Sequence, residues 1–278
     1  MKISERAVKR LLRDPVAFGL LVVRHAWGWK EIDPWQISVL RDVSRYIYMN
    51  CSRQSGKSTI LMVKAIWVAV NIPNALILVV AELRQSNEDL RRVRQLTKAF
   101  SDFLKENTEG ITLDLITENI TSLEFSNGSR IIALPANDKV RGYSAPTMVI
   151  IDEAAWAEDI VLISLNPMMA VSNGQLILAS TPKGTDNFFY REAKNPRYEQ
   201  FNITWRDCPR ITPDYIARER SIYGEAYVRQ EYECRFLEDL STVFSEKSLE
   251  AAMDSEEEVF AEEMDNIQKV LQGEVELI

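Results

Sequence analysis

A glycine, a lysine and two hydroxyl residues, Gly56-Lys57-Ser58-Thr59, stand where an expected strand gives way to an expected helix. Backbone N–H groups of such a loop and of the helix N-terminus point at an anionic ligand, and glycine lets the backbone approach it closely. The lysine adds a point charge for phosphates, and a serine hydroxyl suits Mg²⁺. The pattern predicts Mg²⁺ at Ser58 and a nucleotide-phosphate loop made of Ser52, Arg53, Gln54, Ser55, Gly56, Lys57, Ser58 and Thr59.

The loop departs from the usual pattern at its first position, where Cys51 stands in place of glycine or alanine. A chance Gly-Lys-Ser triplet at a helix start is therefore an alternative on this motif alone. A redox or metal role for Cys51 finds little support, because Cys51, Cys208 and Cys234 lack a metal-ligand spacing. A reducing compartment and no structural zinc are expected.

Two acids, Asp152 and Glu153, follow the apolar run 147–151. A buried strand here would deliver them to the C-terminal edge of a parallel sheet, where open α/β sheets bind ligands. There Asp152 would serve Mg²⁺, and Glu153 would orient or deprotonate a water molecule. A kinase needs no water-activating acid, so the pair favours hydrolysis. Two acids often end a strand at the surface, but their place after a phosphate loop predicts an ATPase.

The elements that must position these groups alternate along the chain. Buried strands are expected at 45–51, 75–81, 148–151 and 175–179, and helices at 57–71 and 84–105. The stretch up to about Trp29 is expected to be helical, and 113–135 to contain a hairpin at Ser126-Asn-Gly-Ser129. This order predicts an α/β fold of the P-loop NTPase type (ASCE division), with a central, mainly parallel sheet flanked by helices.

The pattern changes after Thr204. Helices expected at 214–223 and 225–235 would form a small helical lid. The predicted divisions are an ATPase core at 1–204, a lid or linker at 205–244, and an acidic helical tail or linker at 245–278. Of the 41 acidic and 33 basic residues, 11 and 2 lie from Ser245 onward, which leaves 30 and 31 before it. The net charge of −8 therefore belongs to the tail, and the body can still carry a basic face.

Five further features resemble the large terminase subunit of tailed viruses, and the resemblance covers nearly the whole chain. They are an arginine inside the phosphate loop, Pro34-Trp-Gln36 upstream, Val140-Arg-Gly-Tyr-Ser-Ala145 before the acids, Ser180-Thr-Pro-Lys-Gly184 after a strand, and Glu231-Tyr-Glu-Cys-Arg-Phe236. The resemblance implies that Gln36 reads adenine and that Ser180 and Thr181 couple the γ-phosphate state to movement. We expect Arg141 to act as an arginine finger on a neighbouring subunit, and Arg53 to serve its own nucleotide.

The resemblance also implies ATP and Mg²⁺ as cofactors and double-stranded DNA as the substrate of a packaging motor. Its partners would be a portal protein, the small terminase subunit and further copies in a ring on the portal, built from subunits that can be monomeric in solution. The expected location is the host cell cytoplasm, with no membrane partner, and no nuclease activity is expected from this chain. Lys183, Arg91, Arg92 and Arg94 are candidate DNA contacts. The alternatives are a helicase or translocase of another P-loop family and a non-hydrolysing nucleotide-binding assembly module.

Overall fold

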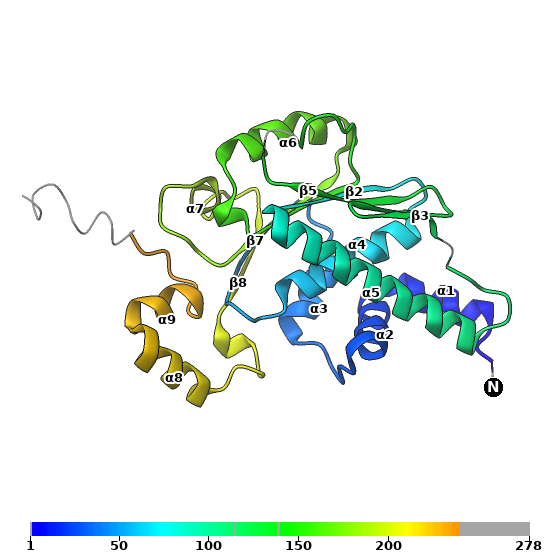
Figure 1. The fold of residues 1–278 in the computed structure, drawn as a ribbon, viewed down its shortest axis with the longest axis horizontal. Helices are drawn as coiled ribbons and strands as arrows, with labels where there is room; N and C mark the ends of the chain where they lie inside the picture. Colours follow the sequence, from blue (N-terminus) through cyan, green and yellow to red (C-terminus); the bar gives the residue numbers. More distant parts are fainter. Residues whose placement is uncertain (1, 114, 138–139, 239–278) are drawn as a thin grey trace, which may run out of the picture. The chain divides into compact units, whose positions relative to one another are not determined.

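The computed structural model describes residues 2–113, 115–137 and 140–238. Eight strands in this part of the chain form one sheet in the order β3-β4-β5-β2-β6-β7-β1-β8 (Figure 1). Their bounds are β1 Tyr46–Cys51, β2 Leu76–Ala81, β3 Leu115–Asn119, β4 Ser122–Phe125, β5 Arg130–Pro135, β6 Met148–Asp152, β7 Gln175–Ser180 and β8 Glu199–Ile203. The strands from β5 to β8 in this order run parallel, and β3 and β4 pair antiparallel at one edge.

The strand β7 lies between the strand before the phosphate loop and the strand that ends in the two acids. It pairs with β1 through Tyr46↔Leu176 and with β6 through Asp152↔Ala179. All of these strands are parallel, so the loop after β1, the acids after β6 and the hydroxyls after β7 meet at one edge. The predicted mainly parallel α/β sheet is confirmed, including the strands at 45–51, 75–81, 148–151 and 175–179.

The helices cover both faces of the sheet (Figure 1). Alternate strand residues, such as Ile77 and Val79 against Leu78 and Val80, enter two separate apolar cores. One core packs under α1 to α5, and the other packs under α6 and α7. The helix bounds are α1 Glu5–Arg13, α2 Pro15–Trp27, α3 Pro34–Arg41, α4 Lys57–Asn71, α5 Leu83–Asn107, α6 Asp159–Ser172, α7 Phe188–Glu192, α8 Pro213–Tyr223 and α9 Glu225–Glu231.

The N-terminal helical stretch is divided into two helices. The side chain of Asp14 accepts a hydrogen bond from the N–H of Val16, and Pro15 occupies the first turn of α2. An Asp cap followed by proline starts a new helix and cannot continue an old one. The sequence patterns missed α3, α7 and β8 and gave no bounds for α6, and α9 ends at Glu231 rather than at Arg235.

The predicted hairpin at Asn127-Gly128 is confirmed. Its turn joins β4 to β5, and the positive φ of Gly128 (81°) is a conformation that glycine adopts without strain. A Cβ at Gly128 would also clash with the side-chain oxygen of Asn74, so a larger residue would force that side chain to move.

The segment after β8 forms the two lid helices α8 and α9 and then returns to the sheet. Phe236 packs edge-on to Tyr190 with 5.0 Å between ring centroids. Met1–Leu237 forms one compact unit, and the expected boundary at Thr204 stays a prediction. The tail expected at 245–278 lies outside the described residues. Among the described helices, none has the length and apolar character to cross a membrane.

Candidate active site

The phosphate loop runs from the buried end of β1 to the first turn of α4. Gln54 and Gly56 have positive φ angles of 60° and 92°, which turn the loop back on itself. The positive φ of Gly56 favours glycine, and a Cβ there would also lie a tight 3.1 Å from the Gln36 amide. The loop is also tied from outside, since Ser52 N–H donates to Ile203 O and Arg53 N–H donates to Glu231 O.

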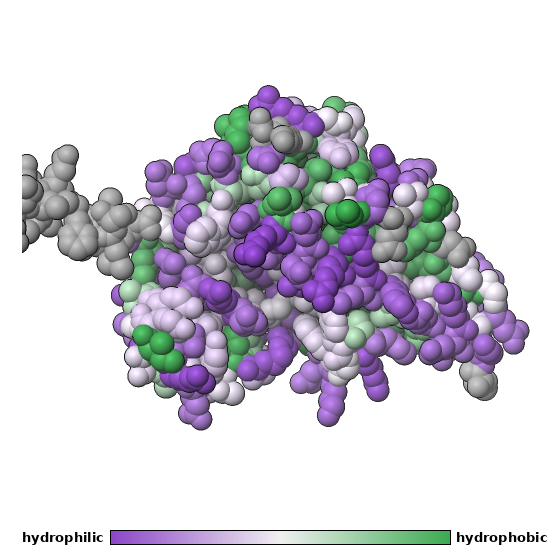
Figure 2. Space-filling model, viewed as in Figure 1, coloured by the Kyte–Doolittle hydropathy of each residue, from purple (hydrophilic) through white to green (hydrophobic). Residues whose placement is uncertain are grey.

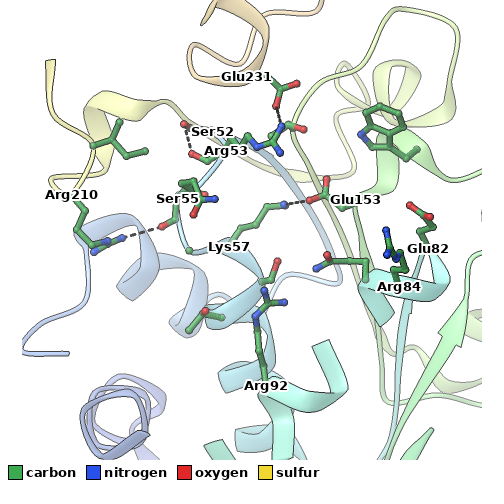
Figure 3. A pocket seen from close by; sticks show the side chains of 18 of the residues that line it. Ser52, Arg53, Ser55, Lys57, Glu82, Arg84, Arg92, Glu153, Arg210 and Glu231 are labelled. Atoms are coloured by element: carbon green, nitrogen blue, oxygen red, sulfur yellow. Dashed lines mark hydrogen bonds and ion pairs between the residues drawn. The ribbon is translucent and has the colours of Figure 1, made fainter. Parts of the chain in front are cut away.

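The two acids converge on the phosphate loop. Ser58 Oγ lies 2.5 Å from Asp152 Oδ2, and Lys57 Nζ lies 2.5 Å from Glu153 Oε1 and 3.6 Å from Asp152 Oδ1. Burial opposes the charged form of Lys57, but the carboxylates of Asp152 and Glu153 outweigh it and hold its pKa above the usual range. Lys57 is therefore a fixed cation at the centre of the site (Figure 3).

Glu153 has a backbone conformation that is uncommon for a residue with a side chain. Its φ and ψ of 54° and 44° are left-handed, which costs about 1–2 kcal/mol in a non-glycine residue. Strain of this kind persists where the surrounding structure imposes it, often at functional sites. Here the carboxylate of Glu153 is placed between Lys57 and Ser180, whose Oγ lies 3.3 Å from Glu153 Oε2.

Of these groups, Lys57, Ser58 and Glu153 line a pocket of about 1000 Å³ between the phosphate loop, the start of α5 and the lid. On the face shown in Figure 2, hydrophilic side chains gather over α5 and toward the lid helices. Thr181, the second hydroxyl of the predicted coupling pair, also lines the pocket. The residues that sequence reasoning missed are Trp29, Glu82, Arg84, Gln85, Trp156, Arg210, Ile211, Tyr215 and Glu231, with Arg92 assigned to DNA instead.

Two lid-side residues hold the phosphate loop. Arg53 lies 3.4 Å from the Glu231 carboxylate, which belongs to α9. Arg210 forms a two-point ion pair with buried Asp33, at 3.0 and 2.7 Å. It also donates to Ser55 O at 3.0 Å (Figure 3). Arg210 stands in no local pattern that would have identified it from sequence, and Glu231 begins a quoted motif that did not predict its contact with Arg53.

Gln36 is completely buried, and both ends of its amide are engaged. Its Oε1 accepts from Asp33 N–H at 2.9 Å and its Nε2 donates to Ser55 O at 3.4 Å. Gln36 therefore braces the phosphate loop against the start of α3. Its expected contact with adenine stays a prediction.

Arg141 is exposed, and its Nε donates to Ser164 Oγ on α6 at 3.1 Å. It is not among the described residues that line the pocket. Arg53, in contrast, lies in the pocket wall.

The candidate DNA contacts are divided by the structure. Arg92 lies in the pocket wall, 2.7 Å from Asp89, while Arg91 pairs with Glu88. Arg94 donates to the carbonyl of Asn119, and Lys183 Nζ lies 3.8 Å from the centre of the Trp156 ring. The contacts that the structure records for these four residues are thus within the chain, and their role with DNA stays a prediction.

Cys51 is buried beneath the loop and is one of three free cysteines. Burial raises the pKa of its thiol well above the usual range, with a further contribution from Cys234. The thiol therefore stays protonated, which is the state least suited to redox chemistry or metal binding.

Ser58 and Asp152 offer hard oxygen atoms of the type that Mg²⁺ prefers. Among the described residues, no group of three or more His, Cys, Asp or Glu side chains could hold a metal ion. Mg²⁺ usually takes one or two protein ligands and completes its shell with waters and nucleotide phosphates.

A phosphate loop, an acid pair at a strand end and one strand inserted between them define a P-loop NTPase of the ASCE division. The family model described as "Terminase large subunit, T4likevirus-type, N-terminal" matches residues 48–251, well over half of the chain. The chain belongs to this family of terminase large subunits and matches its N-terminal part. No curated protein matches the chain.

Solved structures agree in fold. The large terminase ATPase domain of Thermus phage P74-26 has 20% identity and a TM-score of 0.61, over 77% of this chain and 97% of that one. The large terminase of bacteriophage HK97 has 13% identity and a TM-score of 0.63, over 81% of this chain and 55% of that one. A large terminase of a thermophilic bacteriophage, in complex with ADP, has 10% identity and a TM-score of 0.55, over 78% and 53%. The chain thus spans about half the length of the latter two proteins.

Proposed function

We propose that this chain hydrolyses ATP with Mg²⁺ and uses the energy to move double-stranded viral DNA into a capsid. The observation that carries the proposal is the convergence of Lys57, Ser58, Asp152, Glu153 and Ser180 at one sheet edge. Membership of the terminase family supports the packaging role. A portal protein, the small terminase subunit and a ring of copies on the portal belong to the same proposal, which places the motor in the host cell cytoplasm.

The proposal assigns a chemical role to each of the residues that converge at the sheet edge. The loop N–H groups and Lys57 hold the β- and γ-phosphates, and Ser58 and Asp152 would hold Mg²⁺, which neutralises phosphate charge when bound. Glu153 accepts a proton from the attacking water while the water oxygen bonds to the γ-phosphorus. The bond between the γ-phosphorus and the oxygen that bridges it to the β-phosphate breaks, and ADP leaves. Ser180 and Thr181, beside Glu153, sense the γ-phosphate through their hydroxyls.

The first test measures ATP turnover of the wild-type chain with and without double-stranded DNA. We expect ATP turnover to rise when DNA is added, because a packaging motor should couple hydrolysis to the movement of DNA. DNA binding should be insensitive to sequence and fall on the order of 10³–10⁵-fold between about 50 and 200 mM salt if 6–10 phosphates are contacted. No turnover under either condition would indicate a non-hydrolysing assembly module, and DNA unwinding would indicate a helicase. Binding that is insensitive to salt would contradict the phosphate contacts.

Replacing Gln36 tests the adenine-recognition hypothesis against the bracing role. Gln36→Ala leaves the buried N–H of Asp33 without its partner and removes one of the two donors to Ser55 O, of which Arg210 remains. We therefore expect a loss of about 1–3 kcal/mol in the free energy of unfolding. If Gln36 also reads adenine, ATP affinity and the preference for ATP over GTP should fall as well. Denaturant unfolding and competition binding measure the two effects, with exposed Gln200→Ala as the control. An unchanged ATP/GTP preference would leave Gln36 with the bracing role alone.

A further inference from the structure

Hydrogen-bond donors from separate parts of the chain hold the buried carboxylate of Asp152. Its Oδ2 accepts from Ser58 Oγ at 2.5 Å and from Gln85 Nε2 at 3.2 Å. Its Oδ1 accepts from the N–H of Glu153 at 3.0 Å and faces Lys57 Nζ at 3.6 Å. Of these donors, Gln85 is the one supplied by α5, and it lines the nucleotide pocket.

The amide of Gln85 serves a second carboxylate as well. Its Nε2 also donates to Asp89 Oδ1 at 3.0 Å, so both N–H groups of the amide are used. Burial, and then the charge of Asp152, raises the pKa of Asp89 to about 8. The neutral amide of Gln85 lies between the two acids and donates to both. On the other side of Asp89, Arg92 lies 2.7 Å from Asp89 Oδ1. The result is a connected row from Arg92 through Asp89 and Gln85 to Asp152.

We propose that Gln85 is a positioning residue for the Mg²⁺-binding carboxylate of Asp152, itself held in place by Asp89 and Arg92. The inference rests on the proposed function. In that function Ser58 and Lys57 turn to the cation and the phosphates, so neither can keep its present bond to Asp152. Gln85 has no phosphate or cation to bind in this scheme. Its bond therefore persists and keeps the Asp152 carboxylate aimed at the cation.

The test replaces Gln85 with methionine, which keeps the length of the side chain and loses both donors. Loss of a residue that orients a metal ligand typically lowers metal affinity about 10–100-fold. We therefore expect the free Mg²⁺ concentration at half-maximal effect to rise about 10–100-fold, since the carboxylate loses its orientation. The readout is the Mg²⁺ dependence of binding of a fluorescent ATP analogue, and binding of the same analogue in EDTA should not change. Gln95→Met is the matched control, because Gln95 is exposed on the same helix.

Two results would overturn the proposal. One is a wild-type Mg²⁺ midpoint in Gln85→Met. The other is an equal loss of analogue affinity with and without Mg²⁺, which would mean that Gln85 contacts the nucleotide itself. If Gln85→Met does not fold, as judged by its melting curve, Gln85→Asn decides the question, because the shorter amide cannot span both carboxylates. Failure of the proposed function would look different: the chain would bind Mg²⁺ and ATP without hydrolysing it, and the Mg²⁺ midpoint would still report on Gln85.

Discussion

A Glu153→Gln variant is expected to bind ATP with Mg²⁺ and to hydrolyse it on the order of 10²–10⁴-fold more slowly than the wild type. The amide keeps the shape of the side chain and its contact with Ser180, but it cannot accept the proton of the attacking water. It also removes the negative partner of Lys57, which lies 2.5 Å from Glu153. Lys57 is then free to hold phosphate, so binding should be retained while single-turnover hydrolysis is lost.

The contrast with Lys57→Ala makes this test specific. Lys57→Ala removes the cation that holds the phosphates, so both nucleotide binding and hydrolysis should be lost. Equilibrium binding and single-turnover hydrolysis, measured on both variants, separate phosphate binding by Lys57 from water activation by Glu153. Normal hydrolysis by Glu153→Gln would show that another group activates the water, and undiminished turnover in Lys57→Ala would remove the site assignment altogether.

An Arg141→Ala variant is expected to lose on the order of 10³–10⁵-fold in turnover if Arg141 is an arginine finger, the loss typical of such residues. A fixed guanidinium stabilises the negative charge that spreads over the γ-phosphate oxygens in the transition state. Arg141 is exposed, and among the described residues it lies outside the pocket lining of its own chain. A contribution to catalysis would therefore come through a neighbouring copy. Arg53, which lines the pocket, is placed to serve its own nucleotide.

Mixing two inactive variants decides between action within a chain and action across subunits. Under conditions that form rings, Arg141→Ala is mixed with Glu153→Gln. Some interfaces then join an intact Glu153 site to an intact Arg141 donor, so part of the activity should return. The single variants are the controls, and ring composition is checked by mass. If mixed rings form and no activity returns, Arg141 does not act across the subunit boundary.

Features encoded by contiguous residues were predictable from the sequence. The loop from Ser52 to Thr59, the acids after the run 147–151 and the Asn-Gly turn are local patterns, and their backbone conformations follow from residues a few positions apart. Strands buried on both faces are continuous apolar runs, so β2 and β6 could be recognised. In contrast, α6 contains Pro167 and β8 has few buried residues, so their local signals were weak.

Tertiary structure alone decided which polar side chains surround the phosphate loop. Lys57 meets Glu153 across 96 positions and Arg210 meets Ser55 across 155, and such pairings arise only when parallel strands end at one edge. The sequence could indicate that Gln36 matters, but its burial against Ser55 depends on how α3 packs beside α4. Gln85 and Asp89 resemble any polar residues on a surface helix until α5 places them beside Asp152. The sequence by itself therefore determined the class of chemistry, because local motifs encode it. The packing of distant segments determined which residues orient the groups that perform it.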